Sequence, residues 1–262
     1  MRVLFFGDVV GRSGLKALSF FLAPLKEETK ADFVIVNGEN AAADGRGLTY
    51  DDYLEIYGAG ADCVTLGNHF DRKPDILPHL DEEKGIVRPA GYGEEKRGYP
   101  SRVYFVPGHG RIRVSNVMGQ GLMDRDYSSP YEAIDRILKE SDEAVHLVDF
   151  HAESTSEKAI FAHFLAGKVS SVVGTHTHVQ TADERILGGH TAFISDVGMC
   201  GDYDGIIGFD AQTTLDKFVH GKHLALRPGN GEWAMANAVL VDIDEHSGAA
   251  RKIERINRKD KL

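Results

Sequence analysis

The sequence contains little cysteine and no long apolar run, which argues against disulfide-rich secreted proteins and membrane-spanning proteins. Cys63 and Cys200 are the only cysteines among the 262 residues, and this favours a reduced protein over a disulfide framework. No apolar stretch approaches the roughly 20 residues that span a membrane. The N-terminus starts directly with the strand-like residues Met1 to Phe6, so a secretory signal does not fit there. We therefore expect a cytoplasmic protein without membrane contact.

Positive charge is also scarce. Lys and Arg total 30 against 40 Asp and Glu, which gives a formal net charge of −10. Because proteins that coat nucleic acids need a cationic surface, we expect no stable nucleic-acid binding. A small phosphate-containing substrate remains compatible with this charge, since bound metal ions would make a pocket locally positive.

Several common motifs are missing as well. Gly7, Gly11 and Gly14 do not have the spacing of a dinucleotide-binding loop, and no Gly-Lys-Ser/Thr follows them. No Gly-x-Ser-x-Gly nucleophile motif is present. The sequence has no proline- or serine-rich linker, repeat or low-complexity tract, so we expect residues 1–262 to form a single domain.

Strand and helix patterns alternate in the first third of the chain. Apolar runs of strand type at 3–6, 33–36 and 63–66 are separated by a helix at about 15–28 and by a helix that opens at Thr49. Pro24 lies inside the first helix, where it could kink or split it. Strand–helix–strand units of this kind predict parallel strands joined by right-handed crossovers.

The rest of the chain predicts a second set of strands. Alternating residues at 102–106 and 111–117 indicate two antiparallel strands around a turn at 107–110. Helices are predicted at 130–140 and 153–167, the second with Ala159, Ile160, His163 and Phe164 at helical spacing. Further strands are predicted at 144–148, 171–173, 191–195, 236–243 and 250–256, and the basic residues 255–261 are interpreted as a solvated end. We expect an α/β fold in which two sheets face each other with helices outside.

Residue types that bind metals follow five of the predicted strands. In open α/β sheets such positions lie in a crevice outside the carboxyl ends of the strands. Carboxylates, amides and histidines gathered there indicate a two-metal site. The candidate residues are Asp8, Glu39, Asn40, Asn68, His69, His151, His176 and His178.

The acidic and amide candidates have simpler interpretations too. Asp8 could cap the following helix, although Ser13 lies closer to the expected helix start and would cap it better. Asn40 could fix its own loop as an Asx-turn residue. Glu39 has two oxygens, which is what a bridge between cations about 3.5–4 Å apart requires.

The histidine candidates fall into two groups. Asn68 offers an amide oxygen to a metal, while His69 stays free to protonate a leaving group or to bind a phosphoryl oxygen. His176 and His178 face one pocket if the chain is extended, and could bind neighbouring metals separately if it forms a tight loop. Taken alone, this pair is equally well explained by a structural or surface role. His151, at the preceding strand end, makes a metal site the better explanation.

The order and length of these motifs resemble a known family. The candidates from Asp8 to His178, with Gly67 and Gly174 beside them, are similar to the signature of the calcineurin-like metallophosphoesterases. Within that superfamily, the blocks 7–11, 37–42, 148–153 and 173–183 resemble the YmdB-like bacterial phosphodiesterases almost letter for letter. The resemblance implies a four-layer α/β/β/α sandwich with a dinuclear metal centre.

Some positions depart from the family pattern. The usual Asp-x-His has Val10 in place of the histidine and the usual bridging Asp is Glu39, so Asn40 is expected to supply the missing ligand. Gly91 stands where the subgroup has an asparagine, and residues 201–205 depart from a Gly-Pro-Tyr-Asp-Ser pattern. Both loops are expected to border the substrate, so these departures concern substrate preference rather than the metal centre.

The resemblance also implies how the residues divide the chemistry. One metal would be held by Asp8, Glu39, Asn40 and His178, and the other by Glu39, Asn68, His151 and His176, with Glu39 as the bridge. A hydroxide between the ions would attack phosphorus in line, and His69 would protonate the leaving oxygen. Two transition-metal ions are expected, with iron favoured and manganese or zinc as alternatives. The implied substrate is a small phosphodiester such as a 2′,3′-cyclic nucleotide.

Two other functions stay open. A phosphomonoesterase or nucleotidase would use the same metals and would differ in loops such as 92–99 and 201–208. A metal-binding regulatory protein that acts through a partner is the non-enzyme alternative. The sequence also leaves a homo-oligomer open, because exposed Phe or Tyr side chains could form an interface.

Overall fold

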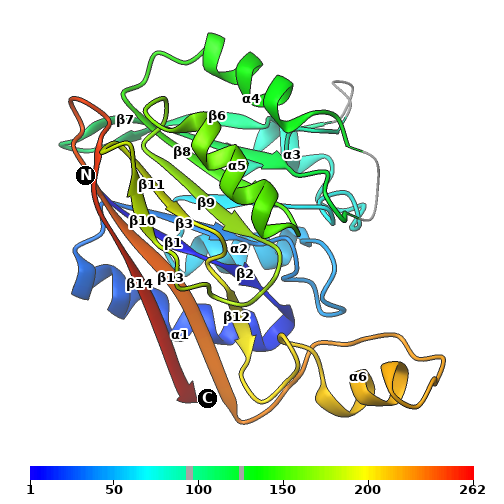
Figure 1. Cartoon of the computed structure of the whole chain (residues 1–262). Coiled ribbons are helices and arrows are strands. Elements are labelled where there is room, and N and C mark those ends of the chain that lie inside the picture. Colours follow the sequence, from blue (N-terminus) through cyan, green and yellow to red (C-terminus); the bar gives the residue numbers. More distant parts are fainter. Residues whose placement is uncertain (93–96, 124–126) are drawn as a thin grey trace.

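Two β-sheets form the centre of the molecule in a computed structural model, which describes residues 1–92, 97–123 and 127–262 (Figure 1). The strands of the larger sheet are β1 (Arg2–Phe6), β2 (Asp8–Val9), β3 (Phe33–Asn37), β4 (Cys63–Thr65), β5 (Ile86–Val87), β12 (Met199–Asp202), β13 (Trp233–Ile243) and β14 (Ala250–Lys261). The strands of the smaller sheet are β6 (Ser101–Val106), β7 (Gly110–Met118), β8 (Val145–His151), β9 (Ser171–Thr175), β10 (Arg185–Leu187) and β11 (Thr191–Ile194).

The strand order places the expected parallel strands at the centre of each sheet. The larger sheet runs β2-β12-β13-β1-β3-β4-β5, with β14 paired to β13, and the smaller runs β10-β11-β9-β8-β7-β6. β1, β3, β4 and β5 are parallel neighbours, as are β7, β8, β9 and β11. β6 and β7 form the predicted antiparallel pair. The carboxyl ends of the parallel strands in each sheet therefore point the same way.

Helices cover the outer face of each sheet. The helices of the described chain are α1 (Gly11–Thr29), α2 (Tyr50–Gly58), α3 (His79–Glu82), α4 (Pro130–Lys139), α5 (Thr155–Leu165) and α6 (Ala211–Phe218), of which α6 has no buried residue and projects away from the sheets. α1 and α2 lie on the larger sheet and α4 and α5 on the smaller one, which gives the expected α/β/β/α order of layers (Figure 1). Over the described ranges, no helix is long and apolar enough to cross a membrane.

Alternation along the strands builds a separate apolar core between each pair of layers. On β1, Val3 and Phe5 face the smaller sheet, where they pack in one cluster with Leu147 of β8. Leu4 and Phe6 point to the other side and pack in the cluster that contains α1 and α2. Because side chains alternate faces along a strand, one five-residue strand contributes to two cores.

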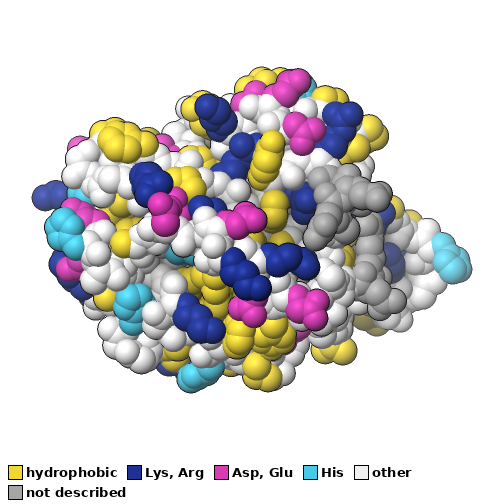
Figure 2. Space-filling view, turned by 90° about the horizontal axis from the view of Figure 1, so that it is seen from above, with side chains coloured by type: hydrophobic (Ala, Val, Ile, Leu, Met, Phe, Trp, Pro, Cys, Tyr) yellow, Lys and Arg dark blue, Asp and Glu magenta, His cyan; other side chains and the backbone are white. Residues whose placement is uncertain are grey.

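Positively and negatively charged side chains are mixed on the face of the molecule that is seen from above Figure 1. Lys and Arg side chains are interspersed there with Asp and Glu and with apolar side chains (Figure 2). This distribution fits the acidic net charge of the sequence.

Several local expectations are wrong. The first helix begins at Gly11, its N-cap residue is Val10 and no side chain caps it, so Ser13 lies inside the helix. Pro24 lies in that helix without ending it. His151 is the last residue of its strand rather than the first residue beyond it. The last strand, expected at 250–256, extends to Lys261 as β14, so residues 255–261 are paired with β13 while most of their side chains are exposed, as expected of a solvated end.

Candidate metal centre

Asp8 lies where the larger sheet splits. β13 pairs with β1 up to Phe6 and then with β12, which is inserted between β13 and β2. Gly7 occupies the split, and a Cβ atom there would lie 1.9 Å from the carbonyl oxygen of Gly198. The Asp8 side chain is fully buried beside this junction. The residue before Asp8 is therefore glycine for a steric reason, because no larger residue fits there. Asp8 does not cap the following helix.

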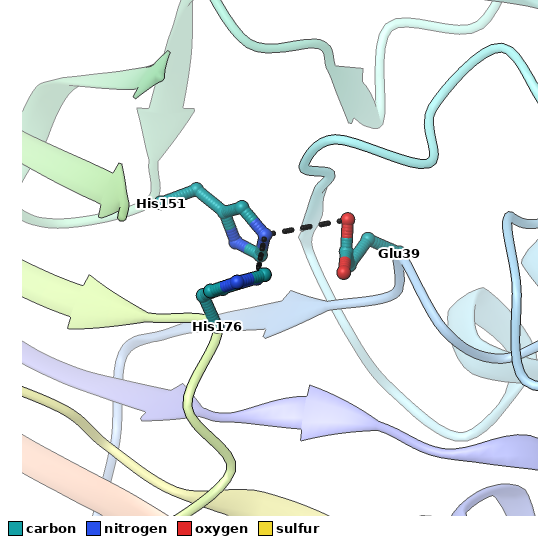
Figure 3. A group of neighbouring side chains, drawn as sticks. All are labelled: Glu39, His151 and His176. Atoms are coloured by element: carbon teal, nitrogen blue, oxygen red, sulfur yellow. Dashed lines mark hydrogen bonds and ion pairs between the residues drawn. The ribbon is translucent and has the colours of Figure 1, made fainter. Parts of the chain in front are cut away.

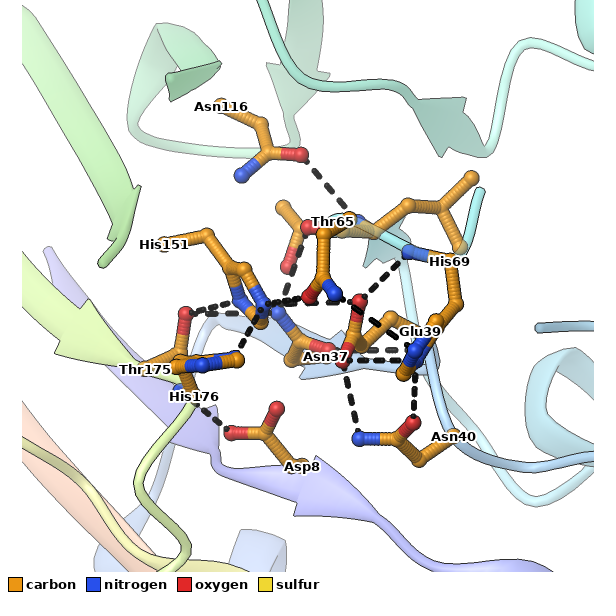
Figure 4. A network of polar contacts seen from close by, with 12 residues as sticks. Asp8, Asn37, Glu39, Asn40, Thr65, His69, Asn116, His151, Thr175 and His176 are labelled. Carbon is orange, nitrogen blue, oxygen red and sulfur yellow. Dashed lines mark hydrogen bonds and ion pairs between the residues drawn. The ribbon is translucent and has the colours of Figure 1, made fainter. Parts of the chain in front are cut away.

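The other candidates come from the ends of four parallel strands. Glu39 and Asn40 follow β3, Asn68 and His69 follow β4, His151 ends β8, and His176 and His178 follow β9. Figures 3 and 4 show five of them, Glu39, Asn40, His69, His151 and His176, gathered at one place, and the distances below add Asn68 and His178. The sequence-based site residues are thus brought together.

One half of the site is a group of close ligand atoms. His151 Nε2 lies 3.4 Å from Glu39 Oε2, 3.1 Å from Asn68 Oδ1 and 3.1 Å from His176 Nδ1. Candidate ligand atoms of Glu39, His151 and His176 all lie within 4.8 Å of one another. These are the distances at which one cation can contact several of these atoms at once.

The other half lies on the opposite side of Glu39. Asn40 Nδ2 donates a hydrogen bond to Glu39 Oε1 at 2.9 Å and lies 3.1 Å from His178 Nε2. His178 Nε2 is 4.0 Å from Asp8 Oδ1. Glu39 therefore stands between the two halves, as a bridging carboxylate would.

The histidine tautomers leave lone pairs directed into the site. His178 Nδ1 donates to the carbonyl oxygen of Ile207 at 2.8 Å, which leaves Nε2 facing Asp8 and Asn40. His176 Nε2 lies 3.2 Å from a Glu153 oxygen, so its Nδ1 faces inward. Fixing a metal-binding imidazole through its outer nitrogen is common in metal centres.

A buried network fixes the third histidine in the same way. The Thr175 hydroxyl donates its one proton to Asp149 Oδ1 at 2.7 Å, so it accepts from His151 Nδ1 at 2.9 Å. His151 Nε2 is then the inward lone pair. Asp149 Oδ2 also accepts from Asn37 Nδ2 at 3.0 Å, and Asn37 Oδ1 accepts from the backbone nitrogen of Glu39 at 3.1 Å. One buried aspartate thus orients two candidate ligands.

Asp149, Asn37 and Thr175 are the functional residues that sequence reasoning missed. Each is fully buried within or at the end of a strand. The signal was available for Asp149, because it lies two residues before His151 and therefore on the same face of the strand. A carboxylate at that position of an otherwise apolar strand needs a partner.

The donor set fits cations. Among the described residues, Asp8 Oδ1 is a buried carboxylate oxygen that has no hydrogen-bond partner. Such an oxygen is costly unless an ion or a donor satisfies it. The surrounding donors are carboxylate oxygens, amide groups and imidazole nitrogens without sulfur, which suits iron, manganese or zinc.

The pKa values show how strongly the site interacts. Burial raises the pKa of the Asp8 carboxyl to about 6, although the charges of His178 and His151 oppose this. Burial also disfavours charge on Glu39, but His151 and His69 outweigh it and hold the pKa of Glu39 well below its usual range. Burial opposes charge on His151, yet Glu39 raises its pKa to about 9. Protein protons thus supply positive charge that cations would otherwise provide.

His69 occupies a different place from the other histidines. Its Nδ1 lies 2.9 Å from Asn40 Oδ1 and 3.4 Å from Glu39 Oε1, and its backbone nitrogen donates to Glu39 Oε2 at 3.1 Å. Its side chain is partly exposed and lines a cavity of about 280 Å³ together with Glu39, Asn40, Glu153, His176, Thr177, His178, Ile207 and Phe209. Nδ1 is held by Asn40, and Nε2 lies 3.4 Å from Asn68 Nδ2, so the ring lies between two candidate ligand residues beside the cavity.

The two departing loops lie in different places. Of residues 201–205, Asp202, Asp204 and Gly205 line a separate cavity of about 540 Å³, whereas Ile207, beyond them, lines the cavity beside the candidate metal ligands. Gly91 has a φ of 111° and lines a separate cavity of about 210 Å³ with Arg88, Tyr92 and Arg136. Of the loop 92–99, residues 93–96 lie outside the described part of the chain.

Comparisons with known proteins identify relatives of this chain. The family model described as YmdB-like protein matches residues 4–256. A 2′,3′-cyclic-nucleotide 2′-phosphodiesterase of Bacillus subtilis is 40% identical over 260 residues, which are 98% of this chain and 96% of the relative.

Solved structures extend the comparison to the fold. A structure described as a novel phosphatase from Mycoplasma pneumoniae has a TM-score of 0.92 at 32% identity, over 100% of this chain and 94% of that one. The calcineurin-like phosphoesterase YfkN from Bacillus subtilis has a TM-score of 0.54 at 12% identity, over 100% of this chain and 90% of that one. The latter likeness concerns the fold alone.

Proposed function

The chain belongs to the YmdB-like protein family and is a phosphoric-ester hydrolase, and we propose that it hydrolyses phosphodiesters at a dinuclear metal centre, with 2′,3′-cyclic nucleotides as the favoured substrates. The Bacillus subtilis relative named for this activity supports the substrate class. The geometry of the crevice between the sheets supports the chemistry.

One observation carries the proposal. Six potential ligands surround Glu39, and one of them, Asp8, has a buried oxygen without a hydrogen-bond partner in the described structure. A site held together only for stability would satisfy that oxygen with a donor. A pair of cations accounts both for this oxygen and for the inward lone pairs of the histidines.

We assign one ion to Asp8, Glu39, Asn40 and His178, and the other to Glu39, Asn68, His151 and His176. When bound, such ions lower the pKa of a coordinated water and neutralise charge on the phosphoryl oxygens. Iron is the favoured metal, and manganese or zinc suits the same nitrogen and oxygen donors.

Asn40 must turn its amide for this assignment. Its nitrogen faces Glu39 and His178 while its oxygen faces His69. Rotation of the amide by about half a turn would direct the oxygen to the ion and the nitrogen to His69 Nδ1. His69 would then accept at Nδ1 and carry its proton on Nε2.

His69 is proposed as the proton donor in the reaction. As a bond forms between a water oxygen and phosphorus, the bond from phosphorus to the leaving ester oxygen breaks. His69, which lines the cavity, gives its Nε2 proton to that oxygen, which would otherwise leave as an alkoxide. Ile207 and Phe209 supply an apolar wall of the cavity that suits a nucleobase.

The test is hydrolysis of 2′,3′-cyclic AMP, 3′,5′-cyclic AMP and a phosphomonoester by protein of measured metal content. We expect selective cleavage of the 2′,3′-cyclic ester, lost on chelation and restored by Mn²⁺. Cleavage of the phosphomonoester alone would favour a phosphatase, the name given to the Mycoplasma structure. Bound metal without cleavage of any ester would favour a binding role.

A further inference from the structure

Lys158 is a charged residue in a buried position, which is unusual for lysine. It lies on α5, its side chain is fully buried, and its Nζ donates to Asp196 Oδ2 at 2.7 Å. Asp196 is buried as well. Burying an ion pair costs solvation free energy that apolar residues of similar size would not cost. The buried Lys158–Asp196 pair is therefore better explained by a role other than stability.

We propose that Lys158 and Asp196 are positioning residues that hold the metal-binding loop from His176 to His178 in its ligating conformation. This inference rests on the proposed metal centre. Neither residue is among the potential ligands, and both act through the backbone of the loop.

The first link runs from Asp196 to the residue between the two histidines. Asp196 Oδ2, which accepts from Lys158, also accepts from the backbone nitrogen of Thr177 at 3.0 Å. His176 has a φ of 102° and His178 a φ of 67°, both in the left-handed region that non-glycine residues disfavour. Such backbone conformations persist only where surrounding contacts enforce them. The bond to Thr177 is such a contact, and it is placed between the two strained residues.

The second link reaches the other side of the site. Asp196 Oδ1 accepts from the backbone nitrogen of Gly198 at 2.8 Å. The carbonyl oxygen of Gly198 accepts in turn from the backbone nitrogen of Asp8 at 3.0 Å. One carboxylate thus ties the histidine loop to the segment that carries Asp8, so the two ligand segments are fixed relative to each other.

The position of Lys158 is built into the motif that precedes the loop. A Cβ atom at Gly174 would lie 3.0 Å from the Cδ atom of Lys158 and 1.8 Å from the carbonyl oxygen of Ser195. The glycine therefore leaves room for the lysine stem beside the end of β9. This assigns a steric role to the first residue of the Gly-Thr-His-Thr-His segment.

Lys158 supplies the opposite charge beside the buried Asp196 carboxylate. Buried carboxylates repel one another at short range, and Asp8 and Glu39 are already buried in the same centre. Lys158 neutralises Asp196, so that Asp196 can accept two backbone hydrogen bonds without adding net negative charge. Without the lysine, the buried carboxylate would have no oppositely charged partner to hold it against Thr177.

Metal binding tests this inference directly. Metal-stripped native protein, Asp196→Asn and the double variant Lys158→Met/Asp196→Asn are titrated with Mn²⁺ by calorimetry, with folding checked by circular dichroism. We expect the Kd for Mn²⁺ to rise by about 10–100-fold in both variants, the usual effect of losing an outer-shell partner. Lys252→Met, which removes an exposed ion pair with Glu254, is the matched control and should bind as the native protein does.

The design separates the two proposals. The double variant contains no unpaired buried charge, so it stays measurable even if Asp196→Asn alone, which leaves the buried Lys158 unpaired, does not fold. Variants that fold and bind Mn²⁺ with native affinity would overturn the positioning role and leave the metal centre intact. A native protein that binds no Mn²⁺ would instead overturn the metal centre. Native thermal stability of the double variant, together with weakened Mn²⁺ binding, would exclude a merely structural role.

Discussion

At the scale of single residues, the site consists of polar groups whose outer atoms are satisfied by the protein and whose inner atoms are not. His151, His176 and His178 each bind an acceptor through one ring nitrogen and present the other to the crevice. Asp8 presents an oxygen without a donor among the described residues. This division is what separates a prepared ligand set from an ordinary buried hydrogen-bond network.

His69 is expected to contribute to turnover rather than to metal binding. His69→Ala should retain Mn²⁺ affinity and lower kcat by about 10²–10⁴-fold, because it removes the proton donor and none of the proposed ligands. Calorimetric Mn²⁺ titration and kcat at saturating Mn²⁺ measure the two effects separately. Loss of metal in proportion to the loss of activity would mean that His69 is a ligand. His79→Ala, at the partly exposed start of α3 and outside the cavity, is the control.

His146 links stability to pH outside the metal centre. Burial, with a smaller effect of the Arg113 charge, lowers the pKa of His146 to about 3 from an ordinary 6.5. At a pH between these two pKa values, the unfolded chain therefore binds a proton at His146 that the folded chain does not bind. The stability that this histidine contributes is complete above about pH 6.5 and is lost as the pH falls toward 3.

His146→Gln should weaken this pH dependence. Glutamine keeps a donor for Ser115, which accepts from His146 Nε2 at 2.8 Å, and it does not titrate. Between pH 6 and pH 4 the free energy of unfolding of the metal-free protein should fall less steeply than in the native protein, by about 1.4 kcal/mol per pH unit. Urea unfolding at several pH values measures the slope. An unchanged slope would show that His146 is not the residue responsible, and His220→Gln, at an exposed position, is the control.

At the scale of elements, sequence periodicity predicted most of what positions the site. The parallel strands, the antiparallel pair β6–β7 and the gathering of candidate ligands at strand ends all follow from apolar runs and their order. These features are local, so a single sequence contains enough information for them. The family resemblance added the order of the layers, which is confirmed.

Features that depend on distant contacts were not predictable in the same way. β12 is inserted between β2 and β13, and its pairing with β2 joins segments about 190 residues apart. The sequence around Gly7 contains no local pattern that predicts this insertion. On α5 the buried face contains Lys158, Phe161, Ala162 and Leu165, whereas Ile160 is exposed. From sequence alone, Lys158 is expected to face solvent, because its buried partner Asp196 is not known at that point.

The left-handed residues of the histidine loop belong to the same class. The sequence left open whether His176 and His178 lie on an extended strand or in a tight loop. The structure places both after the end of β9 with positive φ values. Local preference disfavours this conformation, and it is the bond from Thr177 to Asp196 that holds it.

At the scale of the whole molecule, we propose that the two sheets form one cooperative domain. The metal centre takes Glu39 and Asn68 from the larger sheet and His151 and His176 from the smaller one. A continuous apolar cluster joins the two sheets behind the site. A site divided between the sheets needs them to stay in register, and this core provides the contact.

Leu147→Ala tests that cooperativity. Leu147 is fully buried on β8 in the core between the sheets, so truncation should cost about 2–5 kcal/mol through lost burial and a cavity.

The single tryptophan, Trp233, lies on β13 in the other sheet and reports on that sheet alone. If the molecule is one unit, the urea midpoint followed by Trp233 fluorescence should fall together with the midpoint followed by circular dichroism. A tryptophan transition that stays at its native midpoint while the circular dichroism transition moves would show that the sheets unfold separately. Ile160→Ala, on the exposed face of α5, should leave both midpoints near their native values.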